Sequence, residues 1–157
     1  MSRVLAGVDG SPGSARALRW AAGEARRRGA ELHVVHVWRL PLYAIPDPGG
    51  VVVSSLGDLD HEVVETLERQ AREVLEESVA KLRRETGGDL GVELRAELLR
   101  GDPARELVEA AAGADLLVVG SRGLGGFEGL LLGSVSQKVV QHAPCPAAVV
   151  PAPPDAQ

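Results

Sequence analysis

Short apolar runs alternate along this chain with longer segments in which apolar residues recur every three or four positions. Residues 4–8, 31–38 and 114–119 are rich in aliphatic and β-branched side chains and predict buried strands. Residues 92–99 alternate between polar and apolar, which is typical of a strand at or near the edge of a sheet. A last short strand is expected at residues 147–150.

The segments between these runs have the periodicity of amphipathic helices. The longest covers residues 61–86. Two helix starts are marked by residues that cap helices: Ser11 or Ser14 before the first helix, and Asp102 followed by Pro103 before the third. A fourth helix is expected to end near His142.

Alternation of strands and helices predicts one α/β domain built on an open, doubly wound parallel sheet with helices on both faces. Such sheets bind ligands at the carboxyl ends of the strands, where the winding direction reverses. Residues 39–60 carry several prolines and glycines and predict a long irregular loop, either functional or mobile. The domain is expected to span residues 1–151, with a flexible tail at 152–157.

Composition narrows the classes of function. The chain has 157 residues, of which 45% are hydrophobic and 25% charged, as expected for one globular domain. Its net charge of -5 gives no positive field to attract nucleic acid. Cys145 is the single cysteine, which excludes an internal disulfide and fits a reducing cytoplasm. Neither a signal sequence nor a membrane span is expected, so we predict no membrane partner.

The strongest candidate for chemistry is the glycine-rich segment after residues 114–119. Gly120 and Gly123 are followed, after nine intervening residues, by Gly133 and Ser134 at the start of a helix. Glycines let backbone N–H groups approach a ligand, and a helix start favours an anion such as phosphate. The hydroxyls of Ser134 and Ser136 would add donors. A flexible loop with serine caps remains the alternative.

Several better-known sites are absent from the sequence. Neither the P-loop pattern GxxxxGK[ST] nor the dinucleotide pattern GxGxxG occurs, and the nucleophile elbow GxSxG is missing too. Cys145 stands between two prolines at the entry to the last strand, where a packing role is expected. We therefore expect neither a P-loop NTPase, nor a standard NAD-binding domain, nor a serine or cysteine hydrolase.

Four features together resemble the universal stress protein family: Val8-Asp9-Gly10-Ser11, the block VVGSRG, the spacing G-x2-G-x9-G-S, and the ending VSQKVVQHAPCPAAVV. The resemblance covers the chain except residues 39–60. It implies a five-stranded sheet of order 3-2-1-4-5, of the adenine nucleotide alpha hydrolase-like type. It also implies a homodimer, paired through residues 147–150, and ATP binding in members that carry this glycine pattern.

The same resemblance implies which residues form the nucleotide site. Phosphates would be held by Gly133, Ser134, Val135 and Ser136. Gly120 and Gly123 would flank the ribose and phosphate. The adenine pocket would be lined by Val37 and by the backbone near Ala6 and Gly7.

Two charged residues of the predicted site keep two interpretations each. Asp9 would lie beside the nucleotide and, with phosphate oxygens and waters, could hold Mg²⁺. It could equally be a turn or helix-capping aspartate. Arg122 either pairs with a phosphate or is simply solvated.

The expected function is that of a cytoplasmic ATP-binding stress-response or regulatory protein. Bound nucleotide would set the conformation or dimer surface that it presents to an unidentified protein partner. One alternative is a slow ATPase, although without a P-loop lysine we expect at most weak ATP hydrolysis. The other is a dimeric interaction module that binds no nucleotide.

Overall fold

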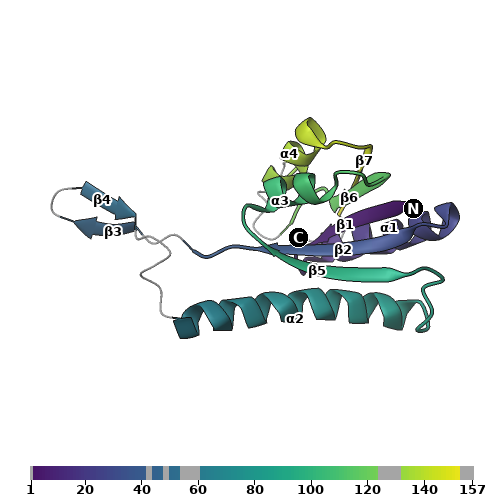
Figure 1. Cartoon of the computed structure of the whole chain (residues 1–157), viewed down its shortest axis with the longest axis horizontal. Coiled ribbons are helices and arrows are strands. Elements are labelled where there is room, and N and C mark those ends of the chain that lie inside the picture. The colour runs from purple at the N-terminus through teal and green to yellow at the C-terminus, as the bar shows by residue number, and fades with distance from the viewer. Residues whose placement is uncertain (1, 42–43, 48–49, 54–60, 124–131, 153–157) are drawn as a thin grey trace.

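The computed structural model describes residues 2–41, 44–47, 50–53, 61–123 and 132–152 (Figure 1). Five strands form one parallel sheet: β1 (Arg3–Val8), β2 (Glu31–Trp38), β5 (Leu94–Arg100), β6 (Leu116–Gly120) and β7 (Ala147–Val150). Their order across the sheet is β5-β2-β1-β6-β7. Counted in chain order, this is the 3-2-1-4-5 arrangement, so the predicted fold class is confirmed.

Four helices cover the two faces of this sheet: α1 (Pro12–Arg28), α2 (His61–Glu85), α3 (Pro103–Ala110) and α4 (Ser134–His142). One apolar core includes Leu18 of α1 and Leu75 of α2, and the other includes Leu107 of α3 and Val139 of α4. In Figure 1, α2 runs along one face and α3 lies with α4 on the opposite face. β1, in the middle, is buried along Val4–Val8 because it is covered on both faces and paired on both edges.

The predicted helix starts are confirmed, and the structure selects between the two serines. Ser11 is the cap of α1, and its Oγ accepts a hydrogen bond from the Ser14 N–H at 3.1 Å. Asp102 caps α3 by accepting from the Arg105 N–H at 3.1 Å, with Pro103 in the first turn. Both caps satisfy N–H groups that a helix start leaves without intrahelical partners.

The prediction of an irregular loop over residues 39–60 is wrong in its middle. Strands β3 (Ala44–Asp47) and β4 (Gly50–Val53) pair there as an antiparallel hairpin, in which Asp47 is opposite Gly50. The β-branched run of β4 favours a strand, and this outweighs the prolines and glycines around it. Residues 42–43, 48–49 and 54–60 of that segment, like the predicted tail beyond Ala152, lie outside the described residues.

The two edge strands differ in length and exposure. β5 is half-exposed, as the alternating pattern predicts, and among the described strands it pairs with β2 alone. β7, the short strand at the other edge, has β6 as its one neighbour among the described strands. No helix in the described part of the chain is long and apolar enough to cross a membrane.

Candidate functional site

The carboxyl ends of β1 and β6 form the rim at which the predicted site lies. These strands are parallel neighbours, but β1 leads into α1 on one face and β6 leads toward α4 on the other. The chain therefore diverges to opposite faces above this strand pair, which is the position where open α/β sheets bind ligands. Asp9 follows β1 directly, and Gly120 is the last residue of β6.

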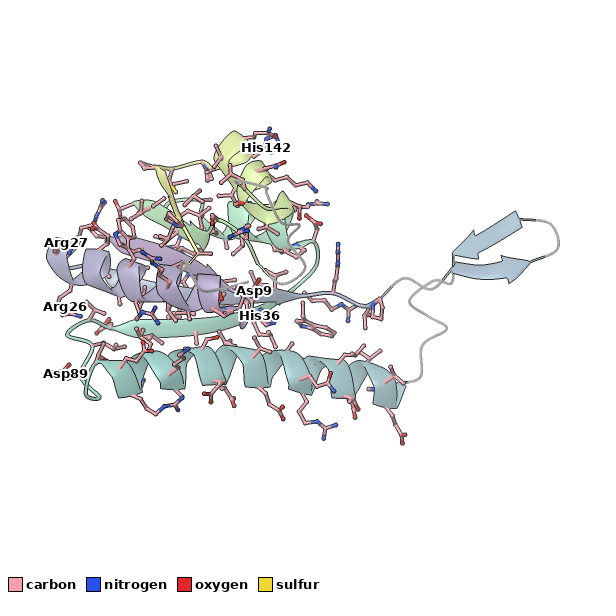
Figure 2. The ribbon with its side chains drawn as sticks, turned by 180° about the vertical axis from the view of Figure 1, so that it is seen from behind. Asp9, Arg26, Arg27, His36, Asp89 and His142 are labelled. Atoms are coloured by element: carbon pink, nitrogen blue, oxygen red, sulfur yellow. The ribbon has the colours of Figure 1, made fainter. Side chains whose placement is uncertain are left out.

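Asp9 shapes the turn between β1 and α1. Its Oδ1 accepts a hydrogen bond from the Ser11 N–H at 2.9 Å, and its own N–H donates to Ser14 Oγ at 3.2 Å. Its Oδ2 faces Gly123, where an added Cβ would lie only 2.2 Å away. Figure 2 shows Asp9 at the amino-terminal end of α1. Asp9 thus has the turn role, and its carboxylate is also part of the rim.

Gly120 is required by the packing of the fold itself. A Cβ on this residue would lie 3.1 Å from the backbone carbon and oxygen of Gly13 and 3.3 Å from Ser14 N. In the same contact, a Cβ on Gly13 would lie 2.8 Å from the carbonyl oxygen of Arg122. The end of β6 and the first turn of α1 therefore touch backbone to backbone. The Gly13 backbone beside Gly120 and the Asp9 carboxylate beside Gly123 explain both glycines without a ligand.

Gly133 is different, because none of the described residues around it requires a glycine there. Its φ of -77° is ordinary, and a Cβ would lie 3.5 Å from Arg122 Cα and Ser121 O, which is normal van der Waals contact. It caps α4 without a side chain, and the first bond of the helix runs from the Gln137 N–H to the Gly133 carbonyl at 3.0 Å. Three backbone N–H groups precede that bond: those of Ser134, Val135 and Ser136.

The two serines at the start of α4 have different environments. Ser136 is 3% exposed, and its hydroxyl lies 2.8 Å from the Ser121 carbonyl oxygen and 3.0 Å from that of Gly133. Because a hydroxyl carries one proton, Ser136 uses it to hold the helix start, not to meet a phosphate. Ser134 is exposed and Val135 is half-buried. Among the predicted hydroxyl donors, only that of Ser134 is at the surface.

Val37 is level with Asp9 across the sheet, because His36 of β2 pairs with Val8 of β1. Its side chain is 9% exposed and belongs to the apolar core under α3 and α4. The register is strengthened by His36, whose Nδ1–H donates to the Val8 carbonyl at 2.8 Å. We did not predict this role for His36.

Ala6 and Gly7 lie within β1, and the expectation that their backbone lines the adenine pocket stays a prediction. Ala6 is fully buried, with its side chain in the core under α1 and α2. Beside Gly7, the methyl carbons of Leu107 would lie 2.9 and 3.0 Å from an added Cβ, so this α3 side chain fills the space. Both residues lie inside the sheet, where their backbones pair with β2.

Ser121 is a structural residue of the site that sequence reasoning missed. It is 8% exposed; its N–H donates to the Val150 carbonyl at 2.8 Å, and its Oγ accepts from the Ala152 N–H at 3.2 Å. Its carbonyl accepts from both the Gly133 N–H, at 2.7 Å, and Ser136 Oγ. One residue thus joins β7, the end of β6 and the start of α4. The available signal is its place inside the glycine block, between Gly120 and Arg122.

Among the described residues, the rim offers a divalent cation one carboxylate, that of Asp9. Because Oδ1 accepts from the Ser11 N–H, Asp9 fits Mg²⁺ only as one ligand of a shell completed by phosphate oxygens and waters. Within the described ranges, no group of three or more His, Cys, Asp or Glu side chains could hold a metal ion. Elsewhere, burial raises the pKa of the half-buried Cys145 thiol, which suits packing better than nucleophilic chemistry.

A hollow of about 510 Å³ lies between the first turn of α1 and one side of α2. It shares Gly10 and Ser11 with the turn after β1, but its other lining residues belong to the opposite face from α4. Glu73, Glu77 and Lys81 stand along its α2 side. The start of α4 does not line this hollow, so it is separate from the glycine-rich rim.

Comparison with known proteins gives one consistent family. Residues 1–151 match the Universal stress protein family. A universal stress protein of Mycolicibacterium smegmatis is 42% identical over 147 residues, which are 94% of this chain and 45% of that protein. This chain therefore spans about half the length of that relative. Universal stress protein YxiE of Bacillus subtilis is 33% identical over 151 residues, 95% of this chain and 98% of the relative.

Solved structures show the same fold. Universal stress protein UspA from Lactobacillus plantarum superposes with a TM-score of 0.75 at 24% identity, over 95% of this chain and 97% of that one. A universal stress protein in complex with cAMP has a TM-score of 0.68 at 25% identity, covering 97% and 98% of the two chains. One from Archaeoglobus fulgidus in complex with dAMP has a TM-score of 0.64 at 26% identity, covering 96% and 98%.

Proposed function

This chain belongs to the universal stress protein family, and from that premise we propose that it binds ATP with Mg²⁺ at the rim between Asp9, Gly123 and the start of α4. Two similar proteins have been solved with adenine nucleotides, cAMP and dAMP. The superposition of each on this chain includes nearly all of its residues. An adenine nucleotide is therefore the ligand class that the family favours, and ATP is our choice within it.

The observation that carries the proposal is the helix start at Gly133. The described residues would accommodate a Cβ at Gly133, whereas they would not at Gly120 or Gly123. A glycine that packing does not require is best explained by an approaching ligand. Backbone N–H groups and the positive end of the helix dipole favour an anion at that place, and phosphate is the anion that a nucleotide supplies.

Each part of the rim has a role in this proposal. The N–H groups of Ser134 and Val135 and the exposed Ser134 hydroxyl would donate to phosphate oxygens. Arg122, held where β6 ends, would supply a cation, and Asp9 would orient Mg²⁺ from the other side. The Mg²⁺ would neutralise part of the phosphate charge. Val37, level with Asp9, would lie on the adenine side.

We propose binding, not efficient turnover, as the activity. Phosphoryl transfer needs a group that orients the attacking water and cations that stabilise the transferred group. The rim offers Arg122 as a cation, and the Asp9 carboxylate already accepts the Ser11 N–H. The protein would then act as a nucleotide-dependent module, in the cytoplasm, toward a protein partner.

We further propose that the module is a homodimer paired through β7. This strand ends the sheet, and its outer edge has no neighbouring strand among the described residues. Unpaired backbone groups on an apolar edge strand favour pairing with another chain, and a second copy gives a closed two-fold contact.

Nucleotide content and thermal stability test the binding proposal. We expect mass spectrometry of the denatured, freshly purified protein to find an adenine nucleotide. ATP with Mg²⁺, added to nucleotide-free protein, should raise Tm by several degrees, since a ligand at one hundred times its Kd contributes about 2.7 kcal/mol. Nucleotide-free protein with no shift at millimolar ATP would favour the dimeric module without nucleotide. Phosphate release far above that of a Gly133→Val control would favour the ATPase.

A further inference from the structure

A buried histidine lies toward the opposite end of the sheet from the rim. His33 of β2 is 2% exposed and is held between two charged side chains. Its Nε2 is 2.7 Å from Glu97 Oε2 on β5, and its Nδ1 is 3.5 Å from Arg3 Nη1 on β1. Three neighbouring strands thus contribute to one row of polar contacts, on the face that α3 and α4 cover.

These partners determine the protonation state of the imidazole. The Glu97 carboxylate can only accept a hydrogen bond, so the proton on the neutral ring must be on Nε2. Nδ1 is then a lone pair, and it accepts from the Arg3 guanidinium. Burial lowers the pKa of His33, with smaller lowering effects from Arg95 and Arg3, while Glu97 raises it. The ring is therefore neutral at neutral pH.

Arg3 connects this row to the end of α3. Its Nη2 donates to the carbonyl of Ala110, the last residue of α3, at 3.1 Å and to that of Ala112 at 2.8 Å. Its backbone N–H donates to Asp115 Oδ2 at 2.7 Å, just before β6. Carbonyls at a helix end lack intrahelical donors, so one guanidinium supplies what the end of α3 needs.

We propose that Arg3, His33 and Glu97 form an acid-sensitive clamp that holds the carboxyl end of α3 and releases it when His33 takes up a proton. On the imidazolium, Nδ1 becomes a donor, and it then faces a guanidinium that can only donate. The contact becomes a repulsion between two cations in a buried place. Arg3 moves away, and the carbonyls of Ala110 and Ala112 lose their donor.

The other charged groups around His33 set the pH at which this happens. Arg95 on β5 opposes protonation together with Arg3, whereas Glu97 favours it. Asp115, which follows α3 in the chain, holds Arg3 by accepting a hydrogen bond from the Arg3 backbone N–H. At the end of α3, the groups in contact with Arg3 are the backbone carbonyls of Ala110 and Ala112, which carry no net charge. Release is therefore expected to begin as the pH falls below about 6.5, the ordinary pKa of histidine, and it does not depend on nucleotide binding.

Hydrogen exchange at the end of α3 tests the clamp. We would follow peptides covering residues 107–115 by mass spectrometry between pH 7.5 and 5.0, with rates corrected for intrinsic exchange. The wild-type protein should be constant down to about pH 6.5, and its exchange should then rise by up to about tenfold per pH unit. His33→Gln keeps a donor for Glu97 and an acceptor for Arg3 but cannot titrate. It should show no rise.

Two controls make the outcome decisive. His142→Gln changes an exposed histidine at the end of α4, labelled in Figure 2, and should behave like the wild type. Should His33→Gln fold poorly, an NMR titration of His33 in the wild type replaces it, and its midpoint must coincide with the exchange transition. A rise that persists in folded His33→Gln, or a His33 midpoint separate from that transition, would overturn the clamp.

Discussion

The carboxylate of Asp9 lies against the backbone of Gly123, so closely that a Cβ on residue 123 would come within 2.2 Å of Asp9 Oδ2. The turn that follows the first strand is thus matched to the loop that follows β6. The glycines of the motif therefore differ in how closely other parts of the chain approach them. Gly120 and Gly123 allow segments of the chain to touch, whereas at Gly133 the described residues leave room for a Cβ.

Gly133→Val is expected to abolish nucleotide binding and leave the fold intact. A side chain at the helix start would occupy the space of the phosphate, while its Cβ meets only ordinary contacts in the protein. Calorimetry measures the binding, and circular dichroism measures Tm of the nucleotide-free variant. The matched control is Gly120→Ala, whose Cβ would press on the Gly13 backbone at 3.1 Å and should cost about 1–3 kcal/mol of stability. An unfolded Gly133→Val would mean that this residue acts through structure.

Ser134→Ala and Ser136→Ala should separate binding from stability. The buried Ser136 hydroxyl donates to backbone carbonyls, so its loss should lower the free energy of unfolding by about 1 kcal/mol. Ser134 is exposed, so its loss should change stability by less than about 0.5 kcal/mol. It should weaken nucleotide binding by roughly 1.5–3 kcal/mol, the contribution of a donor to a charged oxygen. Urea titrations and calorimetry on both variants check this; a reversal of the two effects would contradict the site.

Val149→Pro is expected to yield a folded monomer if the dimer pairs through β7. The Leu117 and Ser121 N–H groups donate to the carbonyls of Pro146 and Val150, so backbone groups of the alternate residue Val149 face the outer edge. Proline there removes an edge donor without removing a bond to β6. Ala148→Pro is the matched variant that should destabilise the sheet itself. Sedimentation of folded Val149→Pro as an unchanged dimer would place the interface elsewhere.

Stability is expected to fall as the pH drops from 7.5 to 5.5, because the pKa of His33 is lower in the folded protein than in the unfolded chain. The unfolded state then binds more protons in this window, so the contribution of neutral His33 is complete above about pH 6.5 and is lost below it, by at most about 1.4 kcal/mol per pH unit. Urea unfolding at several pH values measures the slope. His33→Gln should flatten it. An equal slope in that variant would assign the effect to other groups.

The fold was largely predictable because each element carries its own local signal. Apolar runs, the caps at Ser11 and Asp102 and the period of α2 all agree with the parallel sheet that forms. The hairpin of β3 and β4 was missed because its proline and glycines predict a loop, while a four-residue β-branched run is a weaker signal.

The site was predictable only as a set of positions. The spacing of Gly120, Gly123 and Gly133 locates the rim, but only the contacts around each glycine show which one packing requires. The role of Ser136 could not be read from the sequence, since a serine two residues into a helix is compatible with either a solvent-facing or a buried hydroxyl. Similarly, the sequence does not show that the Leu107 side chain occupies the space beside Gly7, because the two residues are far apart in the chain.

The position of β1 in the middle of the sheet has a consequence for how this protein is made. Within this domain, β1 is synthesised before the other strands of the sheet, and its first neighbour, β2, follows after one helix. Its other edge is completed only by Leu116, Leu117 and Val118, which pair with Val4, Leu5 and Ala6. Throughout the synthesis of α2, β5 and α3, therefore, the nascent domain presents an apolar strand with one open edge. This open edge of β1 is therefore expected to be available for non-native strand pairing until β6 emerges.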